Sequence, residues 1–214
     1  MPMTVAVLPV CFSSLKRNSE PMEKAIKPRL KGEMHYVRYA DDFIVMFQYE
    51  EDARAVMKVL PQRLGKFSLE VSSEKTRILP FGRFRGTKET FDFLGFTFYN
   101  AKTRTGKYRV GIRTSKNKLI SKRKAAKKWL HTEIRQLPVK EILKRVAAVT
   151  RGHCNYYGVN GNLRDITAFW NYMKTETYHM LIRRSQRSRW TWKRFNCLWN
   201  RFVSPPRISV NIWG

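Results

Sequence analysis

The segment at residues 34–48, with the sequence MHYVRYADDFIVMFQ, constrains the fold more than any other part of the chain. Two β-rich runs flank the pair Asp41-Asp42, and the second run, Phe43 to Phe47, is continuously apolar. A short apolar run bounded by turn residues is typical of a strand that is buried on both faces. The segment therefore predicts a β-hairpin whose second strand lies inside a core.

The rest of the first half predicts one helix and several short strands. From Glu50 the apolar residues recur at helical spacing after an acidic start, and Pro61 is expected to kink or end this helix. Strand-like stretches follow at 68–71, 76–79 and 91–99, and 107–112 is a candidate hairpin partner of the last of them. We expect antiparallel strands with a helix.

The second half changes to the period of an α-helix. A helix beginning after Thr114-Ser115 carries on one face the apolar residues Leu119, Ala126, Leu130, Ile134 and Leu137. Further helices are predicted at 139–151, at 163–181 and near 192–202, with a short strand at 208–210. Gly152 is the expected stop of the second helix, which places Asn155, Tyr156 and Tyr157 in a loop, with a structural role favoured over RNA contact. The predicted fold class is α+β, with an all-α basic second part.

The charge of the chain is strongly uneven. The whole sequence has 43 Lys+Arg against 16 Asp+Glu, a formal net charge of +27. Residues 101–214 hold 27 of the basic side chains and only 4 of the acidic ones. Such a segment repels itself unless a polyanion neutralises it, and phosphate backbones do so while releasing counterions. Nucleic acid is therefore the expected partner, and solvated basic helix faces are the simpler alternative.

Several classes of protein fit the composition poorly. No apolar stretch approaches the roughly 18–20 residues that a membrane-spanning helix needs, and no helix has the isolated apolar face of a membrane-surface protein, so no membrane partner is expected. Cys11, Cys154 and Cys197 form no C-x-x-C pair, and the four histidines lack metal-ligand spacing. We expect a cytoplasmic protein without a disulfide framework or a zinc site.

The paired aspartates at the expected hairpin tip are candidate Mg²⁺ ligands. Mg²⁺ prefers carboxylate oxygens, and two-metal phosphoryl transfer gathers such groups in one cleft. By itself, Tyr-x-Asp-Asp is a weak signal that fits a solvated turn better than a metal site, because Asp is a favoured turn residue. The apolar strands on both sides favour a metal site.

Two basic clusters are candidate RNA-binding sites. The first is a helix face with Lys122, Arg123, Lys124, Lys127 and Lys128. The second comprises Arg183, Arg184, Arg187, Arg189 and Lys193, next to Trp190, Trp192 and Phe195. Guanidinium groups can hold phosphates while neighbouring aromatic rings stack on bases. The alternative makes Trp192, Phe195, Trp199 and Phe202 one buried helix stripe, and we expect most of these rings in the core.

A series of motifs, in order along the chain, resembles the group II intron-encoded reverse transcriptases, also called maturases. RYADDFIV at 38–45 resembles the polymerase palm motif, KPRLKGE at 27–33 the segment before it, LEVSSEKTRIL at 69–79 the next motif, and FDFLGFTFY at 91–99 the primer grip. Three segments of the second half resemble the thumb or maturase-specific domain. They are TSKNKLISKRKAAKKWL at 114–130, RGHCNYYGVNGN at 151–162 and RRSQRSRWTWKRF at 183–195. The resemblance predicts an unmatched segment at 1–20, a partial reverse-transcriptase palm at 21–112 and a helical thumb/maturase domain at 113–214.

The resemblance also implies roles for individual residues. Asp41 and Asp42 would be catalytic Mg²⁺-binding residues, Lys75 would lie near the incoming nucleotide, and Phe93-Leu94-Gly95 would contact the primer. The activity implied is that of an RNA-directed DNA polymerase, a nucleotidyltransferase of a mobile element, together with aid to RNA splicing. The partners implied are group II intron RNA and an RNA/DNA template-primer, which would lie along the basic helix face.

The chain departs from this family ahead of Asp41. The family has fingers and an earlier part of the palm with another metal-binding aspartate, and nothing before Asp41 resembles them. Two Mg²⁺ ions need bridging carboxylates from more than one strand, and adjacent residues of a strand point to opposite sides. We therefore expect that the polypeptide does not polymerise DNA alone. Either a truncated reverse transcriptase, completed by a separate N-terminal polypeptide, or a non-catalytic RNA-binding remnant fits these observations.

Overall fold

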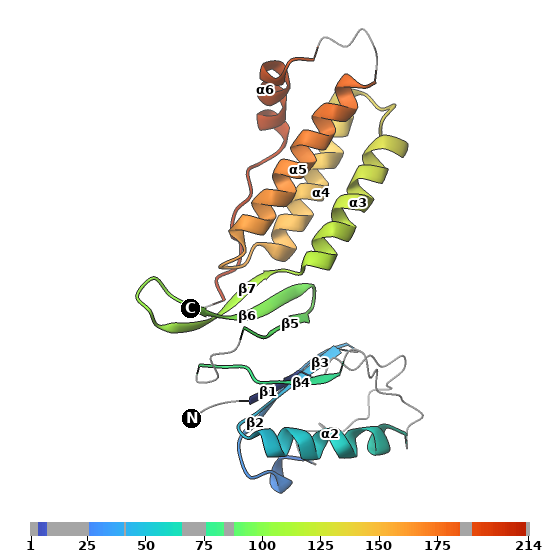
Figure 1. The fold of residues 1–214 in the computed structure, drawn as a ribbon. Coiled ribbons are helices and arrows are strands. Elements are labelled where there is room, and N and C mark those ends of the chain that lie inside the picture. Colours follow the sequence, from blue (N-terminus) through green and yellow to red (C-terminus); the bar gives the residue numbers. More distant parts are fainter. Residues whose placement is uncertain are drawn as a thin grey trace. The chain divides into compact units, whose positions relative to one another are not determined.

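The computed structural model describes residues 4–7, 26–40, 42–65, 76–83, 88–184 and 190–212. Its internal contacts divide the chain into two compact units. The first unit comprises residues 1–94 and 98–111, and the second comprises residues 95–97 and 112–214. The fold is mixed, with antiparallel strands in the first unit and helices in most of the second, in the order shown in Figure 1.

The predicted hairpin is confirmed. The strands β2 (Met34–Tyr39) and β3 (Asp42–Phe47) pair antiparallel, with Tyr39 opposite Asp42 and Met34 opposite Phe47. The chain reverses at Ala40, whose φ of 50° lies in the left-handed region, and the carbonyl of Ala40 accepts a 2.9 Å hydrogen bond from Arg38 Nε. Asp41 lies outside the described residues.

The sheet contains a strand that the sequence did not predict. Its order is β2-β3-β1-β4, in which β1 (Thr4–Val7) pairs antiparallel with both β3 and β4 (Arg77–Leu79). Residues 4–7 belong to the segment that resembles no family motif. The four-residue stretch TVAV does not reveal its partners, because the residues that pair with it lie 39 or more positions further along the chain.

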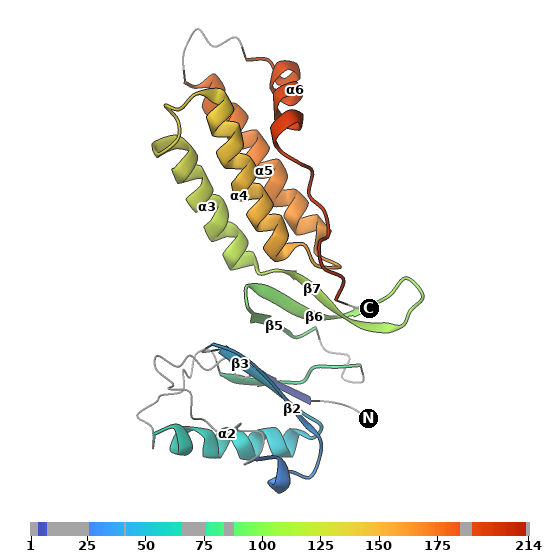
Figure 2. The ribbon, with the colours of Figure 1, turned by 180° about the vertical axis from the view of Figure 1, so that it is seen from behind.

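The strand β3 is buried on both of its faces, as its apolar run predicted. Phe43, Val45 and Phe47 point to one side, where they pack against α2 (Glu50–Gly65), and Ile44 belongs to a second cluster with Phe91. Figures 1 and 2 show α2 lying along one face of the sheet. This alternation places a core on each side of the hairpin strand.

Pro61 was expected to kink or end the helix α2, and the helix continues beyond it to Gly65, so the expectation of an end there is wrong. Pro61 lacks the N–H that would bond to the carbonyl of Met57. Pro61 is exposed, and Met57 is only half-buried, so water can satisfy that carbonyl. Before the proline, Val56 and Leu60 are buried on the inner face of the helix.

A second sheet of the described residues has the order β5-β6-β7, with β5 (Thr90–Phe93), β6 (Phe96–Lys102) and β7 (Tyr108–Thr114). The expected single run at 91–99 is therefore two strands. Leu94 and Gly95 separate them, with φ values of 50° and 79°. Positive φ at both central residues is typical of a type I′ turn, which joins antiparallel neighbours. The predicted pairing of the region 107–112 with this run is confirmed.

The second unit contains the helices α3 (Lys116–Thr132), α4 (Val139–Tyr157), α5 (Leu163–Ile182) and α6 (Trp192–Phe202). Figures 1 and 2 show α3, α4 and α5 side by side, and α5 packs against the other three helices. The apolar face of α3 buries Ala126 and Leu130, while Ile134 is buried just after that helix ends.

The helix α4 runs through Gly152 and ends before Gly158, so the predicted stop at Gly152 is wrong. An exposed glycine within a helix costs only about 1 kcal/mol relative to alanine. The residues beyond it offset that cost, because His153 and Tyr157 are buried on the inner side of the helix. Asn155, Tyr156 and Tyr157 therefore lie in the last turns of α4 and not in a loop.

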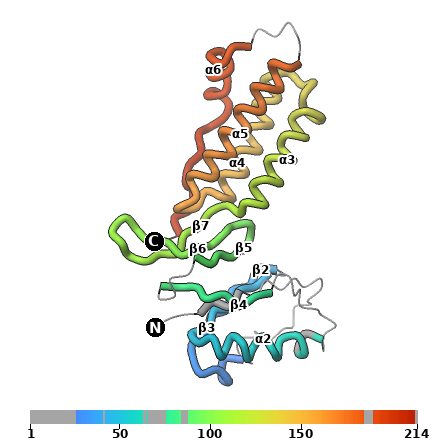
Figure 3. The backbone as a smooth tube through the Cα atoms, viewed as in Figure 1, coloured from blue at the N-terminus to red at the C-terminus, as the bar shows by residue number. Residues whose placement is uncertain are grey.

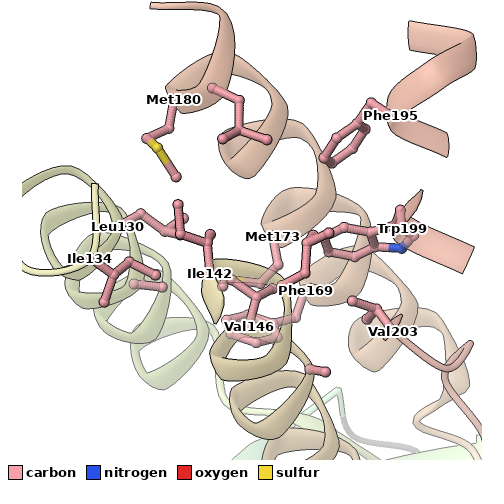
Figure 4. Packing of buried hydrophobic residues seen from close by; sticks show 14 residues of the cluster. Leu130, Ile134, Ile142, Val146, Phe169, Met173, Met180, Phe195, Trp199 and Val203 are labelled. Carbon is pink, nitrogen blue, oxygen red and sulfur yellow. The ribbon is translucent and has the colours of Figure 1, made fainter. Parts of the chain in front are cut away.

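The core of the second unit is formed by apolar residues from all four helices (Figure 4). Phe195 and Trp199 are 0% exposed, Phe202 is partly buried, and Trp192 is 42% exposed. The expected aromatic stripe of α6 is thus confirmed for its two central rings. Edge-to-face packing of Trp170 on Trp199, with ring centroids 5.4 Å apart, joins α5 to α6.

The segment after α6 runs back alongside α5 toward the connection between α4 and α5 (Figure 3). There the backbone N–H groups of Ser209 and Val210 donate to the carbonyl of Gly158. The strand expected at 208–210 is reduced to one parallel bridge between Val159 and Val210. Within the described part of the chain, no helix combines the length and apolar character needed to cross a membrane.

Candidate nucleic-acid interface

The hairpin tip presents one described carboxylate of the predicted pair. Asp42 is half-buried at the start of β3, opposite the exposed Tyr39, whereas Asp41 and Lys75 lie outside the described residues. Among the residues that the structure describes, no group of three or more His, Cys, Asp or Glu side chains could hold a metal ion. A two-metal site needs bridging ligands from more than one strand, and Asp42 is the described carboxylate of the predicted pair.

The predicted primer-contacting residues occupy the turn between β5 and β6. Phe93 is 8% exposed and packs in a core with Phe91, so its ring faces the interior. The carbonyl of Gly95 accepts a 2.8 Å hydrogen bond from the N–H of Ser115, the residue before α3. The side chain of Phe93 therefore supports the turn, and the turn itself is held to the start of the basic helix.

The helix α3 carries the most concentrated positive charge in the described structure. Its 17 residues include seven Lys or Arg side chains and no Asp or Glu. Lys122, Lys124 and Lys128 are exposed. Lys127 Nζ lies 3.8 Å from Glu176 Oε2 on α5, which neutralises part of its charge. Four of the five predicted residues of this face are thus exposed, and of these Lys127 lies beside an acidic side chain of α5.

Arg123, the fifth residue of this face, is held against α5. Its guanidinium lies 5.3 Å from the ring centroid of Tyr172, and its backbone carbonyl accepts a 3.3 Å hydrogen bond from the Tyr172 hydroxyl. The side chain is half-buried. A guanidinium over an aromatic ring is favoured by the ring quadrupole. Arg123 is therefore better placed to join two helices than to reach a phosphate.

Lys122 lies over two tyrosine rings, and the sequence analysis did not predict these contacts. Its Nζ is 4.6 Å from the ring centroid of Tyr157 and 5.9 Å from that of Tyr156. Burial, followed by the charge of Lys118, lowers the pKa of Lys122 below its ordinary value. The direct prediction of a basic face missed these rings because it treated residues 155–157 as a loop.

The second predicted basic cluster divides into different environments. Arg187 and Arg189 lie outside the described residues, and Arg183 and Lys193 are exposed. Arg184 donates from its guanidinium to the carbonyls of Leu137, at 2.8 Å, and Gln136, at 3.0 Å. These bonds hold the connection between α3 and α4, so the guanidinium of Arg184 already has protein acceptors.

Two cations near α6 lie over aromatic rings, in contacts that the sequence analysis did not identify. Lys174 Nζ lies 5.1 Å from the ring centroid of Trp170 and 5.7 Å from that of Trp192. The guanidinium of Arg194 lies 5.2 Å from the ring of Trp190. Trp170 and Lys174 are four residues apart on one helix, as are Trp190 and Arg194 along the chain, and this spacing was a signal that could have found both pairs.

His153 is a buried histidine next to this basic face. It is 4% exposed and stacks on Phe169, with ring centroids 3.9 Å apart. Neither ring nitrogen has a hydrogen-bond partner among the described residues. Burial, with a smaller contribution from the charge of Lys122, lowers the pKa of His153 to about 3. The ring is therefore neutral at physiological pH and packs as an aromatic side chain.

Comparison with known proteins finds a family match in the first part of the chain. Residues 12–98 match a protein family described as "Reverse transcriptase (RNA-dependent DNA polymerase)". The matched span contains the hairpin β2-β3, the helix α2 and the turn at Leu94-Gly95. The match supports a reverse transcriptase, and a domain that copies an RNA template binds nucleic acid. A search of curated proteins found no match.

Proposed function

We propose that this chain is part of a group II intron reverse transcriptase/maturase and that it binds intron RNA through the exposed lysines of α3. The observation that carries the proposal is the exposed Lys122, Lys124 and Lys128 on a helix without acidic residues. It stands beside a reverse-transcriptase match in the preceding part of the chain. Phosphates of a bound strand would replace the counterions that this face otherwise attracts.

The catalytic part of the proposal concerns the hairpin. Asp41 and Asp42 are proposed as metal-binding residues of the family's polymerase, Lys75 as a residue near the nucleotide, and Phe93-Leu94-Gly95 as the primer contact. The burial of the Phe93 ring favours a primer contact through the backbone of the turn. Mg²⁺ is the proposed metal, a hard cation that binds carboxylate oxygens.

A second candidate is an RNA-binding protein without polymerase activity. The uneven charge favours it, because 27 basic against 4 acidic residues in 101–214 provide RNA affinity without any metal site. Primer extension distinguishes the two candidates. DNA synthesis on an RNA template, by the chain with a supplied N-terminal reverse-transcriptase polypeptide, supports the first. RNA binding without synthesis under the same conditions supports the second.

RNA binding as a function of salt tests the shared part of both candidates. The full chain is titrated with a structured intron RNA and with an unrelated RNA of equal length. We expect the affinity to fall steeply with salt, by several log units per log unit of salt concentration, and to favour the intron RNA. Weak binding would contradict the proposal, and equal binding of both RNAs would remove its maturase part.

A set of variants assigns the binding to α3. Each of Lys122, Lys124 and Lys128 is replaced by Gln. The slope of log affinity against log salt concentration should fall by roughly one unit for each phosphate that no longer has an ammonium partner. The control replaces Lys58, Lys88 and Lys102, three exposed lysines of the first unit, which removes the same charge elsewhere. Equal reductions in both triple variants would show that net charge, and not this face, determines the affinity.

A further inference from the structure

An aromatic cluster lies where α4 ends, next to the start of β6. We call Phe96, Tyr156 and Tyr157 the aromatic platform. The rings of Phe96 and Tyr156 are nearly parallel, with an interplanar angle of 11° and centroids 5.9 Å apart. Tyr157 packs against both, at 5.1 Å from Phe96 and 4.7 Å from Tyr156. Tyr156 is 53% exposed, whereas Tyr157 is 3% exposed. The platform therefore offers one aromatic ring to solvent on a packed aromatic base.

Buried neighbours fix the base of the platform. The ring of His153 lies 4.7 Å from that of Tyr157 and also stacks on Phe169, at 3.9 Å. Gly95 approaches the hydroxyl of Tyr157 so closely that a Cβ atom would lie 2.8 Å from it. Because Tyr157 is enclosed in this way, Tyr156 stands on a support that does not need to rearrange when a ligand arrives.

The charge beside the platform is positive. Lys122 Nζ lies 5.9 Å from the centroid of Tyr156, and the exposed Lys118 stands one helical turn before it on α3. The helix α3 has no acidic residue, and the one acidic residue of α4, Glu141, lies in its first turn, at the opposite end from Tyr156. A ligand that fits this place has a flat aromatic part and an anionic part, which is the chemistry of a nucleotide.

We propose that Tyr156 and Lys122 form a stacking site for an unpaired nucleotide of a bound nucleic-acid strand. The base stacks on the exposed Tyr156 ring, and the ammonium groups of Lys122 and Lys118 hold the flanking phosphate. This inference rests on the proposed RNA binding and gives it a specific contact. It also explains why an exposed aromatic residue follows the buried turns of α4 at the basic face.

The test uses the full chain and a short single-stranded RNA that carries one 2-aminopurine, a base whose fluorescence is quenched by stacking. Affinity and fluorescence at saturation are measured separately. We expect Tyr156→Ala and Tyr156→Leu to lose the quenching and to weaken binding roughly 5- to 100-fold. Tyr156→Phe keeps the aromatic face, so it should retain both signals. Lys122→Met should weaken binding and reduce the salt slope by about one unit.

Two controls separate stacking from general effects. Tyr49→Ala removes another exposed tyrosine, 45% exposed in the first unit, and should leave both signals unchanged. A fully paired RNA duplex has no base free to stack, so its binding should not depend on Tyr156. Tyr156→Leu keeps an apolar side chain packed on Phe96. If both Tyr156→Ala and Tyr156→Leu lose affinity and quenching, the cause is therefore the missing aromatic ring and not a local change of packing.

The outcomes distinguish this inference from the proposed function. If Tyr156→Ala and Tyr156→Leu bind and quench like the unaltered chain, the stacking site is overturned while RNA binding stands. If the unaltered chain binds no RNA at any salt concentration, the proposed function is overturned and the stacking site with it.

Discussion

Gly95 and Tyr157 pack so closely that the position of a Cβ atom on Gly95 is 2.8 Å from the hydroxyl oxygen of Tyr157. Gly95 also has a φ of 79°, which L side chains rarely adopt. Tyr157 is buried against the rings of Phe96 and His153 and cannot easily move away. The turn after β5 is therefore joined to the last turn of α4 by a close approach that only glycine permits.

We expect Gly95→Ala to lower the free energy of unfolding by roughly 2–4 kcal/mol, from backbone strain and the clash with Tyr157 together. Gly106→Ala is the matched control, because Gly106 has the same φ of 79° and nothing within 4 Å of the added Cβ. It should lose only about 1 kcal/mol. In urea denaturation, adding Tyr157→Phe to Gly95→Ala should restore part of the lost free energy of unfolding, because the hydroxyl that clashes with the new Cβ is removed. If the losses of the two single variants simply add in the double variant, the close approach is contradicted.

The burial of His153 predicts a pH dependence of stability. Its pKa is lowered from 6.5 to about 3 in the folded chain. Between these values the unfolded chain binds one more proton at this site, so the free energy of unfolding falls as the pH falls through this range. The slope contributed is at most about 1.4 kcal/mol per pH unit.

Urea denaturation at pH 7 and pH 5 measures this contribution as the difference between the unaltered chain and His153→Phe. The variant should lose less stability on acidification, because it has no imidazole to protonate. Overpacking by the larger ring would shift the stability at both pH values equally and leave the difference intact. His35→Phe, at an exposed histidine, is the control. Identical slopes for the unaltered chain and His153→Phe would show that His153 does not have the lowered pKa.

Asn162 joins three segments of the second unit. Its Oδ1 accepts from the N–H of Thr114 at 2.8 Å, and its Nδ2 donates to Thr114 Oγ1 at 2.9 Å and to the carbonyl of Tyr157 at 2.8 Å. The side chain is 1% exposed. Asn162→Ala should destabilise the chain by about 1–3 kcal/mol, since three buried hydrogen bonds are lost, although the Thr114 N–H keeps its bond to Asp165 and the Tyr157 carbonyl its bond to Val159.

The measurement for Asn162 is thermal or urea unfolding, with Asn171→Ala as the control. Asn171 is exposed on α5, so its replacement tests the general effect of losing an asparagine from this region. A destabilisation below about 1 kcal/mol for Asn162→Ala would mean that water replaces the three bonds.

Trp199 is expected to be the largest aromatic contribution to the core of the second unit. Trp199→Ala should cost about 3–5 kcal/mol. Trp199→Phe should cost much less, because it keeps an aromatic ring and removes an indole N–H that has no hydrogen-bond partner among the described residues. Trp192→Ala, at the 42% exposed end of α6, is the comparison. Similar destabilisation at Trp192 and Trp199 in denaturation experiments would contradict the packing.

Arg183 and Arg184 should differ in what they contribute. Arg184→Gln should lower stability by about 1–3 kcal/mol, since its guanidinium holds the carbonyls of Gln136 and Leu137. Arg183→Gln should leave stability unchanged and weaken RNA binding, because Arg183 is exposed. Both variants are measured by unfolding and by RNA titration, and a large decrease of RNA affinity in folded Arg184→Gln would reverse the assignment.

Much of the local structure followed from the sequence because its signals are short in range. The apolar run Phe43 to Phe47 was enough to predict a strand buried on both faces, and the spacing from Leu163 onward was enough to predict α5. The errors arose where packing outweighed a local preference. Gly152 does not end α4, because the buried His153 and Tyr157 stabilise the next turn.

The candidate interface shows the same division between sequence and structure. The basic face of α3 is a property of composition and helical period, so Lys122, Lys124 and Lys128 could be named in advance. The aromatic platform beside it could not be predicted, because Phe96 and Tyr156 are 60 positions apart in the chain. In the same way, the charge pattern could not predict the hydrogen bonds of Arg184 to the carbonyl groups before α4.

The sequence by itself therefore determined the helical periods, the hairpin and the concentration of positive charge in the second half, because each depends on residues near one another in the chain. The tertiary structure alone decided that residues 4–7 enter the sheet, that Arg184 is held by backbone carbonyls and that Lys122 lies over Tyr157. The physical reason is that pairing and side-chain packing depend on which distant segments the fold brings together, and a local pattern carries no information about those distances.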